Sequence, residues 1–324
     1  MRKTINKKLI FVLFFVVAVF LILFLISVWE GRQQSSADSQ SDHILVYQGE
    51  EYVLKNDLET FLVLGLDKFQ DAPVSDSYNN DQQADFLMLF VIDNDAQTVS
   101  VLQINRDTMV DVNVLGLNGN KVSTVTKQIA LSHTYGNGGN VSCRNTADSV
   151  SALLNGMKID HYFSLKMDAV SVFNDLVGGV TLEILDDFPS EDSTLKKGQT
   201  VTLTGEQALN YVRKRQGMED NSNIARMERQ RQYVEALYYQ TKYRMENDEN
   251  FVVDASLQMK DYLVSDRSVT QMQQLANKFQ TYEFVEIGTI RGESRVGTQL
   301  MEFYADADHV QEIVVQLFYE LKNG

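Results

Sequence analysis

The chain has few of the residues on which several common protein classes depend. It holds one cysteine, Cys143, so no disulfide can form within it, and its two prolines exclude a proline-rich disordered tract. Its four histidines, His43, His133, His161 and His309, are scattered and match no zinc-binding spacing.

Positive charge and the common nucleotide-binding and nucleophile motifs are also scarce. There are 29 lysines and arginines against 44 aspartates and glutamates, a net charge of -15. An acidic chain lacks the basic face that nucleic acids require, so no nucleic-acid partner is expected. Gly136, Gly138 and Gly139 match neither the dinucleotide fingerprint nor the P-loop. No serine or cysteine nucleophile is accompanied by a recognisable histidine base.

One long hydrophobic run is present. Residues 9–28 carry no charge and are numerous enough to span a bilayer. Four basic residues precede the run, so the positive-inside rule predicts a cytoplasmic tail at 1–8 and a single-pass membrane protein with the rest of the chain outside the cytoplasm. A cleaved signal peptide is the alternative, but the run is too long and no small-residue cleavage site follows it.

The remaining chain is predicted to form a spacer and one extracytoplasmic domain. Residues 29–43 are polar and of low complexity, as in a flexible linker. The domain is predicted to cover residues 44–324, with its core at 60–240. It is expected to begin with a hairpin within residues 44–55.

Three apolar runs predict buried strands, at residues 61–66, 86–92 and 98–104. The last two are joined by a short turn and should pair antiparallel. If the first runs parallel to the third, Asp67, Asp85 and Arg106 meet at one edge of the sheet. A carboxylate pair is a hard-oxygen site that can hold Mg²⁺. The alternative is that the two aspartates simply end strands.

Further along, residues 121–140 are predicted to be an irregular loop, whereas residues 146–155 and 169–177 have the spacing of amphipathic helices. Their apolar residues could belong to an ordinary core or could line a pocket for a lipid chain. A helical stretch, a strand and a closing helix are expected at residues 251–280, 284–290 and 309–321.

The stretch from Leu203 to Leu237 predicts two helices joined by a polar loop, the first opened by a capping box of Thr204 and Gln207. It contains five arginines, at positions Arg213, Arg215, Arg226, Arg229 and Arg231. The second helix is predicted to bury Ile224, Met227, Val234 and Leu237 and to carry Arg226, Arg229, Gln230 and Tyr233 on its other face. Arginine forks suit phosphate, so the cluster is either a phosphate clamp or a solvated helix face.

Several ordered blocks resemble the LytR-CpsA-Psr family. The blocks are Leu64–Asp67, Asp85–Leu89, Ile104–Thr108, Asn174–Val180, Leu203–Arg215 and Asp220–Gln230. The resemblance implies an α/β three-layer sandwich with a central mixed sheet flanked by helices. It also implies a Mg²⁺-dependent phosphotransferase in a Gram-positive-type bacterium. Such an enzyme moves a glycopolymer, such as teichoic acid or capsular polysaccharide, from an undecaprenyl-pyrophosphate carrier to peptidoglycan.

Residue by residue, the resemblance implies two metal ligands, Asp67 and Asp85. It implies a pyrophosphate-binding set of Arg106, Arg213, Arg215, Arg226 and Gln230, in which Arg106 and Arg213 also act in catalysis. It makes the two amphipathic helices the walls of a lipid pocket, with Val150, Leu154, Val170, Phe173 and Val177 as lining residues. The nucleophile is then a muramic-acid hydroxyl, and Asp107 beside Arg106 is the candidate base.

Two departures from the family pattern keep alternatives open. Gln83 stands where many relatives have arginine, and Asn105 where many have proline; Arg144 or Arg229 could compensate for the missing arginine. The alternative functions are an anchored binder of polyprenyl-pyrophosphate glycolipids that does not catalyse transfer, and an envelope-related transcriptional attenuator. The short predicted cytoplasmic tail cannot hold a DNA-binding module, which disfavours the attenuator.

Overall fold

The structure is a computed structural model. It describes residues 44–68, 80–188, 194–215, 217–220, 222–297 and 300–322. The predicted tail, transmembrane helix and linker (1–43) lie outside these residues. Among the residues that are described, no helix combines the length and the apolar character needed to cross a bilayer. The chain divides into two compact units, one of Met1–Leu54 with Glu320–Gly324 and one of Lys55–Tyr319.

The smaller unit, as far as it is described, is built around a three-stranded sheet. β1 (Leu45–Tyr47) and β2 (Glu50–Leu54) pair antiparallel, and β15 (Tyr319–Leu321) follows β2 in the sheet. Gln48 and Gly49 have positive φ angles of 52° and 89°, as a two-residue type I′ turn requires. The predicted hairpin in this stretch is confirmed.

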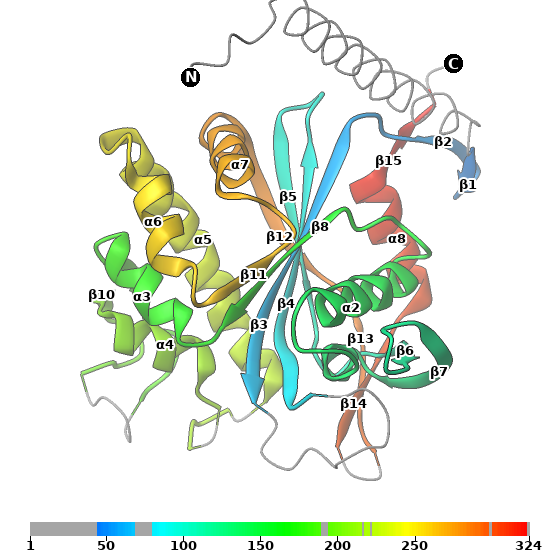
Figure 1. Ribbon diagram of the computed structural model, residues 1–324, viewed down its shortest axis with the longest axis horizontal. Coiled ribbons are helices and arrows are strands. Elements are labelled where there is room, and N and C mark those ends of the chain that lie inside the picture. Colours follow the sequence, from blue (N-terminus) through cyan, green and yellow to red (C-terminus); the bar gives the residue numbers. More distant parts are fainter. Residues whose placement is uncertain are drawn as a thin grey trace, which may run out of the picture. The chain divides into compact units, whose positions relative to one another are not determined.

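A six-stranded mixed sheet forms the centre of the larger unit (Figure 1). Its strands, in spatial order, are β11 (Leu263–Ser265), β8 (His161–Lys166), β3 (Leu58–Lys68), β4 (Gln82–Asp93), β5 (Thr98–Ile104) and β12 (Glu283–Thr289). β4 pairs antiparallel with both β3 and β5, so β3 and β5 run in the same direction. β8 lies parallel to β3, and β12 parallel to β5. The predicted α/β class with a central mixed sheet is confirmed.

Helices lie on both sides of this sheet (Figure 1). On one side are α2 (Asn140–Leu153) and α8 (Ala307–Phe318). On the other side are α3 (Ala169–Leu176), α4 (Gly205–Arg213), α5 (Asn223–Asn247), α6 (Phe251–Met259) and α7 (Val269–Thr281). Each expected helix is present, but the helical stretch expected at 251–280 is divided by β11 into α6 and α7. The closing helix ends earlier than predicted, because its last residues extend into β15.

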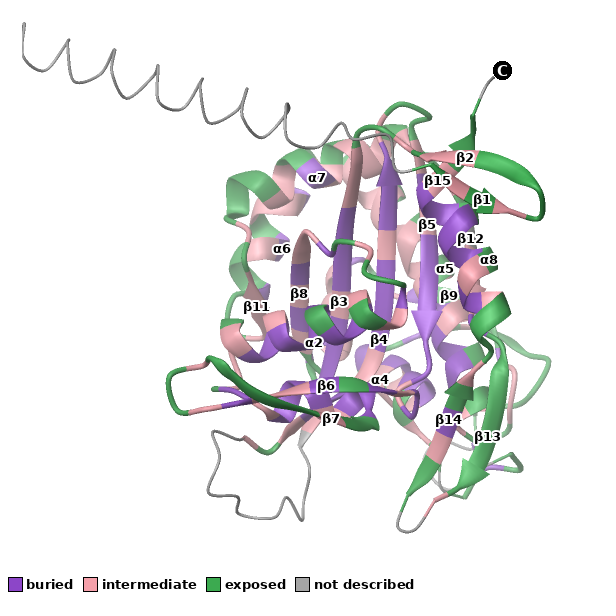
Figure 2. Ribbon diagram, turned by 90° about the vertical axis from the view of Figure 1, so that its right-hand side faces the viewer, coloured by how far each residue is buried: buried purple, intermediate pink, exposed green. Residues whose placement is uncertain are grey.

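Alternate residues of the central strands face opposite helical layers. On β3, Leu62 and Leu64 are fully buried in a cluster that includes Val150 of α2, whereas Phe61 packs in a second cluster with Leu275 of α7. Figure 2 shows β3, β4 and β5 buried along most of their lengths. The sheet is therefore a rigid support for whatever side chains lie at its edges.

Three hairpins and a short 3₁₀ helix complete the larger unit. They are β6 (Met109–Leu115) with β7 (Lys121–Gln128), β9 (Val180–Glu183) with β10 (Thr200–Leu203), β13 (Gly292–Val296) with β14 (Met301–Ala305), and η1 (Ile129–Thr134). The prediction of an irregular loop at 121–140 was therefore wrong for β7. That strand is almost wholly exposed and pairs with β6 through its backbone, so it leaves no burial pattern in the sequence.

The start of α4 is fixed by its own cap and by close packing on α3. The predicted capping box is present, with Thr204 and Gln207 each bonding the other's backbone N–H. The N–H of Gly205 donates to Asp175 of α3 at 2.8 Å. A Cβ at Gly205 would lie 2.4 Å from the Ser171 carbonyl oxygen, so only glycine fits this contact.

We expect Gly205→Ala to lower the free energy of unfolding by about 1–3 kcal/mol, the usual cost of overpacking. Helix propensity alone predicts the opposite sign, because alanine is the better helix former by about 1 kcal/mol. Urea denaturation of the purified protein measures the change. The exposed neighbour Glu206→Ala is the control and should stay within about 0.5 kcal/mol of the parent. A stabilised Gly205→Ala variant would contradict the contact.

Candidate active site

One end of the central sheet carries the charged residues singled out in the sequence. Asp67 lies near the end of β3, Asp85 near the start of β4, and Arg106 two residues after β5. Because β4 runs opposite to its two neighbours, all three residues reach the same edge. The last residue of α4, Arg213, reaches this edge from the helical layer and pairs with Asp67.

A β-bulge turns Asp85 into this group. Across β3 and β4, Gly65 is opposite Phe86 and Leu66 is opposite Ala84, so Asp85 is the extra residue with no partner. A bulge re-aims the side chain of the residue it inserts. Gly65 allows the local approach of the strands, because a Cβ there would lie 2.9 Å from Cβ of Phe86.

Arg106 is the centre of the charged group. Its guanidinium forms an ion pair with Asp85, donates to Oε1 of Gln83 at 2.9 Å, and lies 3.4 Å from Oδ1 of Asp107. Its Nε is buried and has no hydrogen-bond partner among the described residues. Gln83, the residue that departs from the family pattern, thus accepts a hydrogen bond from a site arginine and orients it.

Arg213 binds Asp67 as a fork. Its Nη2 lies 2.7 Å and 3.0 Å from the two carboxylate oxygens, and its Nε lies 3.2 Å from Oδ2. Half of the Arg213 side-chain surface is exposed, so solvent or a ligand can reach the guanidinium. An exposed pair of this kind holds geometry more than it adds stability.

Arg226 reaches the site through a chain of amide contacts. Its Nη2 donates to Asn223 at 2.6 Å, and Asn223 donates to Oδ1 of Asn105 at 2.8 Å. Arg226 is buried, and burial is the largest cause that lowers its pKa to about 10, with Asp85 acting in the opposite direction. The guanidinium remains charged at neutral pH, and its desolvated charge favours an anion beside it.

Burial raises the pKa of two site carboxyls, Asp85 and Asp107. Arg106 and Arg226 oppose the shift at both residues, and Asp67 adds to it at Asp85. Arg215 is exposed and lies near enough to lower the pKa of both Asp107 and Arg226. All these groups therefore share one electrostatic environment.

The polar face of α5 is buried, and the prediction that this helix buries its apolar residues holds for Met227 and in part for the half-buried Val234 and Leu237, but not for Ile224. Arg226, Arg229, Gln230 and Tyr233 are buried together with Met227, whereas Ile224 is 58% exposed. The spacing of apolar residues did not predict this burial, because the first turns of α5 pack against backbone carbonyls and carboxylates. These acceptors require hydrogen-bond donors. The interpretation of the arginine cluster as a solvated helix face was therefore wrong for Arg226 and Arg229.

Arg229 and Gln230 hold the end of α4. Arg229 donates to the Tyr211 carbonyl at 3.0 Å, to the Lys214 carbonyl, and to Asp186 at 2.5 Å. Gln230 donates to the Val212 carbonyl at 3.1 Å. The last carbonyls of a helix have no partner within it, and these two side chains supply one. Both residues thereby fix the position of Arg213.

Neither arginine proposed to replace the missing one does so. Arg229 is 1% exposed and uses its guanidinium on α4 and Asp186. Arg144 lies on α2 and bonds the Ile159 and Asp160 carbonyls and Asp266. Arg231, the fifth arginine of the cluster, donates to Gln103 of β5 at 2.9 Å.

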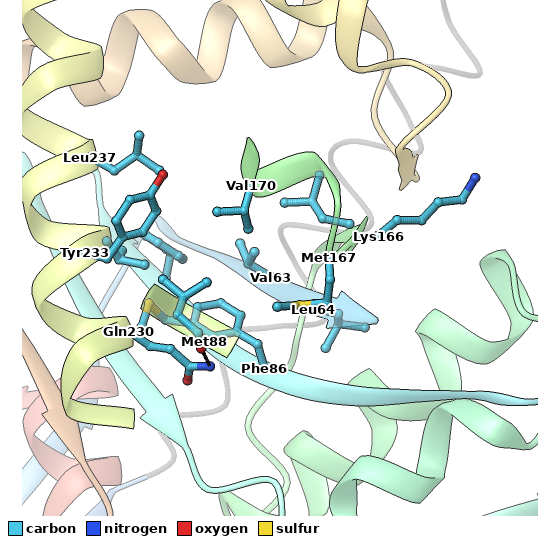
Figure 3. Close-up of a pocket in the computed structure, with 15 residues that line it drawn as sticks. Val63, Leu64, Phe86, Met88, Lys166, Met167, Val170, Gln230, Tyr233 and Leu237 are labelled. Carbon is cyan, nitrogen blue, oxygen red and sulfur yellow. Dashed lines mark hydrogen bonds between the residues drawn. The ribbon is translucent and has the colours of Figure 1, made fainter. Parts of the chain in front are cut away.

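An apolar cavity of about 200 Å³ is lined by residues of the central sheet and of the helices α3, α4 and α5 (Figure 3). It is lined from β3 by Val63, Leu64 and Gly65, from β4 by Phe86, Met88 and Phe90, from β8 to α3 by Leu165, Lys166, Met167 and Val170, and from α4 and α5 by Val212, Gln230, Tyr233, Val234 and Leu237. In Figure 3 the Lys166 side chain extends away from the apolar group. Phe86 next to Asp85, Val212 next to Arg213, and Gln230 one turn after Arg226 form part of the wall, which places the cavity beside the charged edge.

Only part of the predicted lipid-pocket set lines this cavity. Val170 does, and Gln230 from the pyrophosphate set does as well. Phe173 and Val177 pack in a cluster behind it. Val150 and Leu154 are fully buried in the cluster on the α2 side of the sheet and do not line this cavity. Their helix is amphipathic because it covers the other face of the sheet.

The sequence prediction missed the residues that hold the charged groups in place. They are Gln128, Asn223 and Asp186. Gln83 and Asn105, noted in the sequence only as departures from the family pattern, hold site groups as well. Asn223 gave a signal, since it stands within one turn of Arg226. Gln128 and Asp186 are distant in sequence and gave none.

The chain belongs to the LytR_cpsA_psr family, whose model matches residues 25–318. Two curated relatives are described as polyisoprenyl-teichoic acid–peptidoglycan teichoic acid transferases. TagU of Halalkalibacterium halodurans is 28% identical over 182 residues, 56% of this chain and 53% of that protein. TagV of Bacillus subtilis is 28% identical over 162 residues, 48% of this chain and 38% of that protein. The chain thus spans about half the length, or less, of these relatives.

Solved structures share the fold. The crystal structure of Bacillus subtilis TagV has a TM-score of 0.62 and 20% identity, with 82% of this chain and 97% of that chain covered. A structure of TagT bound to LI-WTA has a TM-score of 0.61 and 22% identity, with 81% and 90% covered. At these identities the likeness concerns the architecture.

The buried Arg229 and the exposed Arg213 should respond differently to the same substitution. We expect Arg229→Met to lower the free energy of unfolding by about 3–5 kcal/mol, because it leaves Asp186 and two carbonyls unpaired. Arg213→Met should change it by less than about 1 kcal/mol. Urea midpoints of the two variants, measured side by side, test this. Equal midpoints would show that Arg229 does not hold the end of α4.

Proposed function

We propose that this protein transfers a glycopolymer from a polyprenyl-pyrophosphate carrier to peptidoglycan. The observation that carries the proposal is the junction of a charged edge with an apolar cavity, because such a carrier has a pyrophosphate at the end of a hydrocarbon chain. The names of TagU and TagV describe transfer of teichoic acid to peptidoglycan, which supports the same substrate class. Which glycopolymer is transferred is left to experiment, and capsular polysaccharide stays among the candidates.

The cavity suits the first part of the polyprenyl chain. Its volume of about 200 Å³ is below the ~300–1,000 Å³ typical of small-molecule pockets. The cavity therefore takes the isoprene units nearest the pyrophosphate, with Val170, Tyr233 and Leu237 as apolar walls. The predicted membrane helix at 9–28 would keep the domain at the outer face of the bilayer, where the carrier lies.

The arginines supply the anion site. Arg226 is buried and fixed by Asn223, whereas Arg213 is exposed and can exchange Asp67 for a phosphate oxygen. Arg106 and Arg215 lie close enough to lower the pKa of Arg226, and they add positive charge to the same site. Guanidinium forks match phosphate oxygens in pairs, which is the reason for arginine rather than lysine here. Gln230 acts indirectly, since its amide is bonded to Val212 and Gln103.

Asp67 and Asp85 fit a magnesium ion that completes its shell with water and phosphate oxygens. Burial is the largest cause that raises the pKa of Asp85, and the nearby Asp67 adds to it; a divalent cation beside Asp85 would favour its ionised form. The described residues offer no group of three histidine, cysteine or acidic ligands, so a fully protein-bound metal is not proposed. When bound, Mg²⁺ would neutralise charge on the pyrophosphate.

In the proposed reaction, a hydroxyl oxygen of peptidoglycan attacks the phosphorus next to the glycan. A new oxygen–phosphorus bond forms while the bond to the bridging oxygen breaks, and polyprenyl phosphate leaves with the electron pair. Asp107 takes the hydroxyl proton, and its raised pKa suits a general base. Arg106, Arg213 and Arg226 stabilise the charge on the transferring group.

One observation favours the alternative of a non-catalytic binder. Arg106 and Arg213 are both neutralised by aspartates within the described site, and Gln83 adds no charge. Such a site could hold a glycolipid without activating it. Transfer of labelled glycan to peptidoglycan by the parent protein decides between the two functions.

We expect Arg213→Met to lower the rate of transfer by roughly 10²–10³-fold, the usual effect of removing one group that stabilises developing charge. The measurement is single-turnover transfer of labelled lipid-linked glycan to peptidoglycan fragments. Arg291→Met is the matched control, because Arg291 is an exposed arginine whose partner is Glu312, outside the site. Equal rates for the two variants would remove Arg213 from the mechanism.

We expect Mg²⁺ binding to require both carboxylates and to weaken with acid. Affinity should fall as the pH is lowered through the raised pKa of Asp85, since the carboxyl must lose its proton to bind the ion. Calorimetry in two buffers should detect proton release. Asp67→Asn and Asp85→Asn should lose binding, whereas Asp111→Asn on β6 should keep it. Binding that survives in all three variants would place the ion elsewhere.

A further inference from the structure

Gln128 is a buried side chain that joins Asp107 to the β13–β14 hairpin. It is the last residue of β7 and is 4% exposed. Its Nε2 donates to Oδ1 of Asp107 at 2.9 Å and to the Met301 carbonyl of β14 at 2.6 Å. No motif or resemblance singled it out in the sequence.

The backbone around Asp107 is tied to the same hairpin. The N–H of Phe303 donates to the Asp107 carbonyl at 2.8 Å, and Thr108 forms a parallel bridge with Phe303. The N–H of Asp107 itself donates to the side chain of Asn105 at 3.0 Å. Asp107 is therefore fixed through its backbone, and Gln128 adds a restraint on its carboxylate.

The two carboxylate oxygens of Asp107 have different surroundings. Oδ1 accepts from Gln128 and lies 3.4 Å from Nε of Arg106. Oδ2 has no hydrogen bond or ion pair with a described residue, and the side chain keeps 12% of its surface exposed. Besides Arg106, the charged groups close enough to act on this carboxylate are Arg226, Arg215 and Asp85.

The geometry points to Gln128 as a positioning residue, which holds Oδ1 of Asp107 so that Oδ2 is presented to the acceptor hydroxyl. This inference rests on the proposed transfer reaction. In that step the hydroxyl proton passes to Oδ2, the acceptor oxygen bonds to phosphorus, and polyprenyl phosphate leaves. Gln128 touches no reacting atom; it limits rotation of the carboxylate, which would otherwise turn the accepting oxygen away from the proton.

Gln128→Met tests the inference, because methionine has similar length and no donor. We expect a kcat about 10-fold to 100-fold lower, with KM for the lipid-linked donor unchanged within about 2-fold, since a misplaced base slows chemistry and leaves binding intact. Gln128→Glu should lose at least as much. Thr126→Ala, on the same strand, removes a side-chain hydrogen bond to Asp111 outside the site and should keep the parent kcat.

A double-mutant cycle with Asp107→Asn separates positioning from general damage. Asp107→Asn alone should lower kcat by roughly 10²–10⁴-fold. Adding Gln128→Met to that variant should change kcat by less than about 2-fold. A further 10-fold loss in the double variant, a parent-like kcat in Gln128→Met, or a loss expressed in KM would each overturn the inference. Absence of transfer by the parent protein would instead refute the proposed function, and the inference with it.

Discussion

The burial of charged and amide side chains against the end of α4 is the constraint on which the site depends. Arg229 gives its guanidinium to two carbonyls and to Asp186, and Gln230 gives its amide to a third carbonyl. A buried cation is costly unless all its donors are matched, so α4 and α5 have one acceptable arrangement. That arrangement fixes the position of Arg213 at the end of α4 and the position of Arg226 at the charged end of the sheet.

Two of the site arginines are paired with the site's own aspartates. Arg213 pairs with Asp67 and Arg106 with Asp85, whereas the buried Arg226 donates to the neutral amide of Asn223. A pyrophosphate alone would have to separate these pairs. Under the proposed function, Asp67 and Asp85 would hold a magnesium ion, and Arg213 and Arg106, released from these carboxylates, would turn to phosphate. The bound ion would offset negative charge on the pyrophosphate.

The strands and helices of the larger unit were largely predictable, because apolar runs and helical spacing report burial directly. The convergence of Asp67, Asp85 and Arg106 was predicted from two features. These are the short turn between the strands at 86–92 and 98–104, and the assumed parallel direction of the strands at 61–66 and 98–104. Three features did not follow. The bulge at Asp85 is a register shift without a residue signature, β7 pairs through its backbone alone, and the buried face of α5 satisfies acceptors that lie far away in sequence.

The charged edge and the apolar cavity are built from the same short segments. Phe86 follows Asp85, Arg213 follows Val212, and Gln230 lies one turn after Arg226. In each pair the charged residue belongs to the charged edge and the other residue lines the cavity. Neighbours on a strand or helix cannot move independently. In a ligand that occupies both places, the phosphates and the hydrocarbon chain therefore lie at a fixed distance from each other. Under the proposed function, this coupling would favour a pyrophosphate joined to a lipid over either part alone.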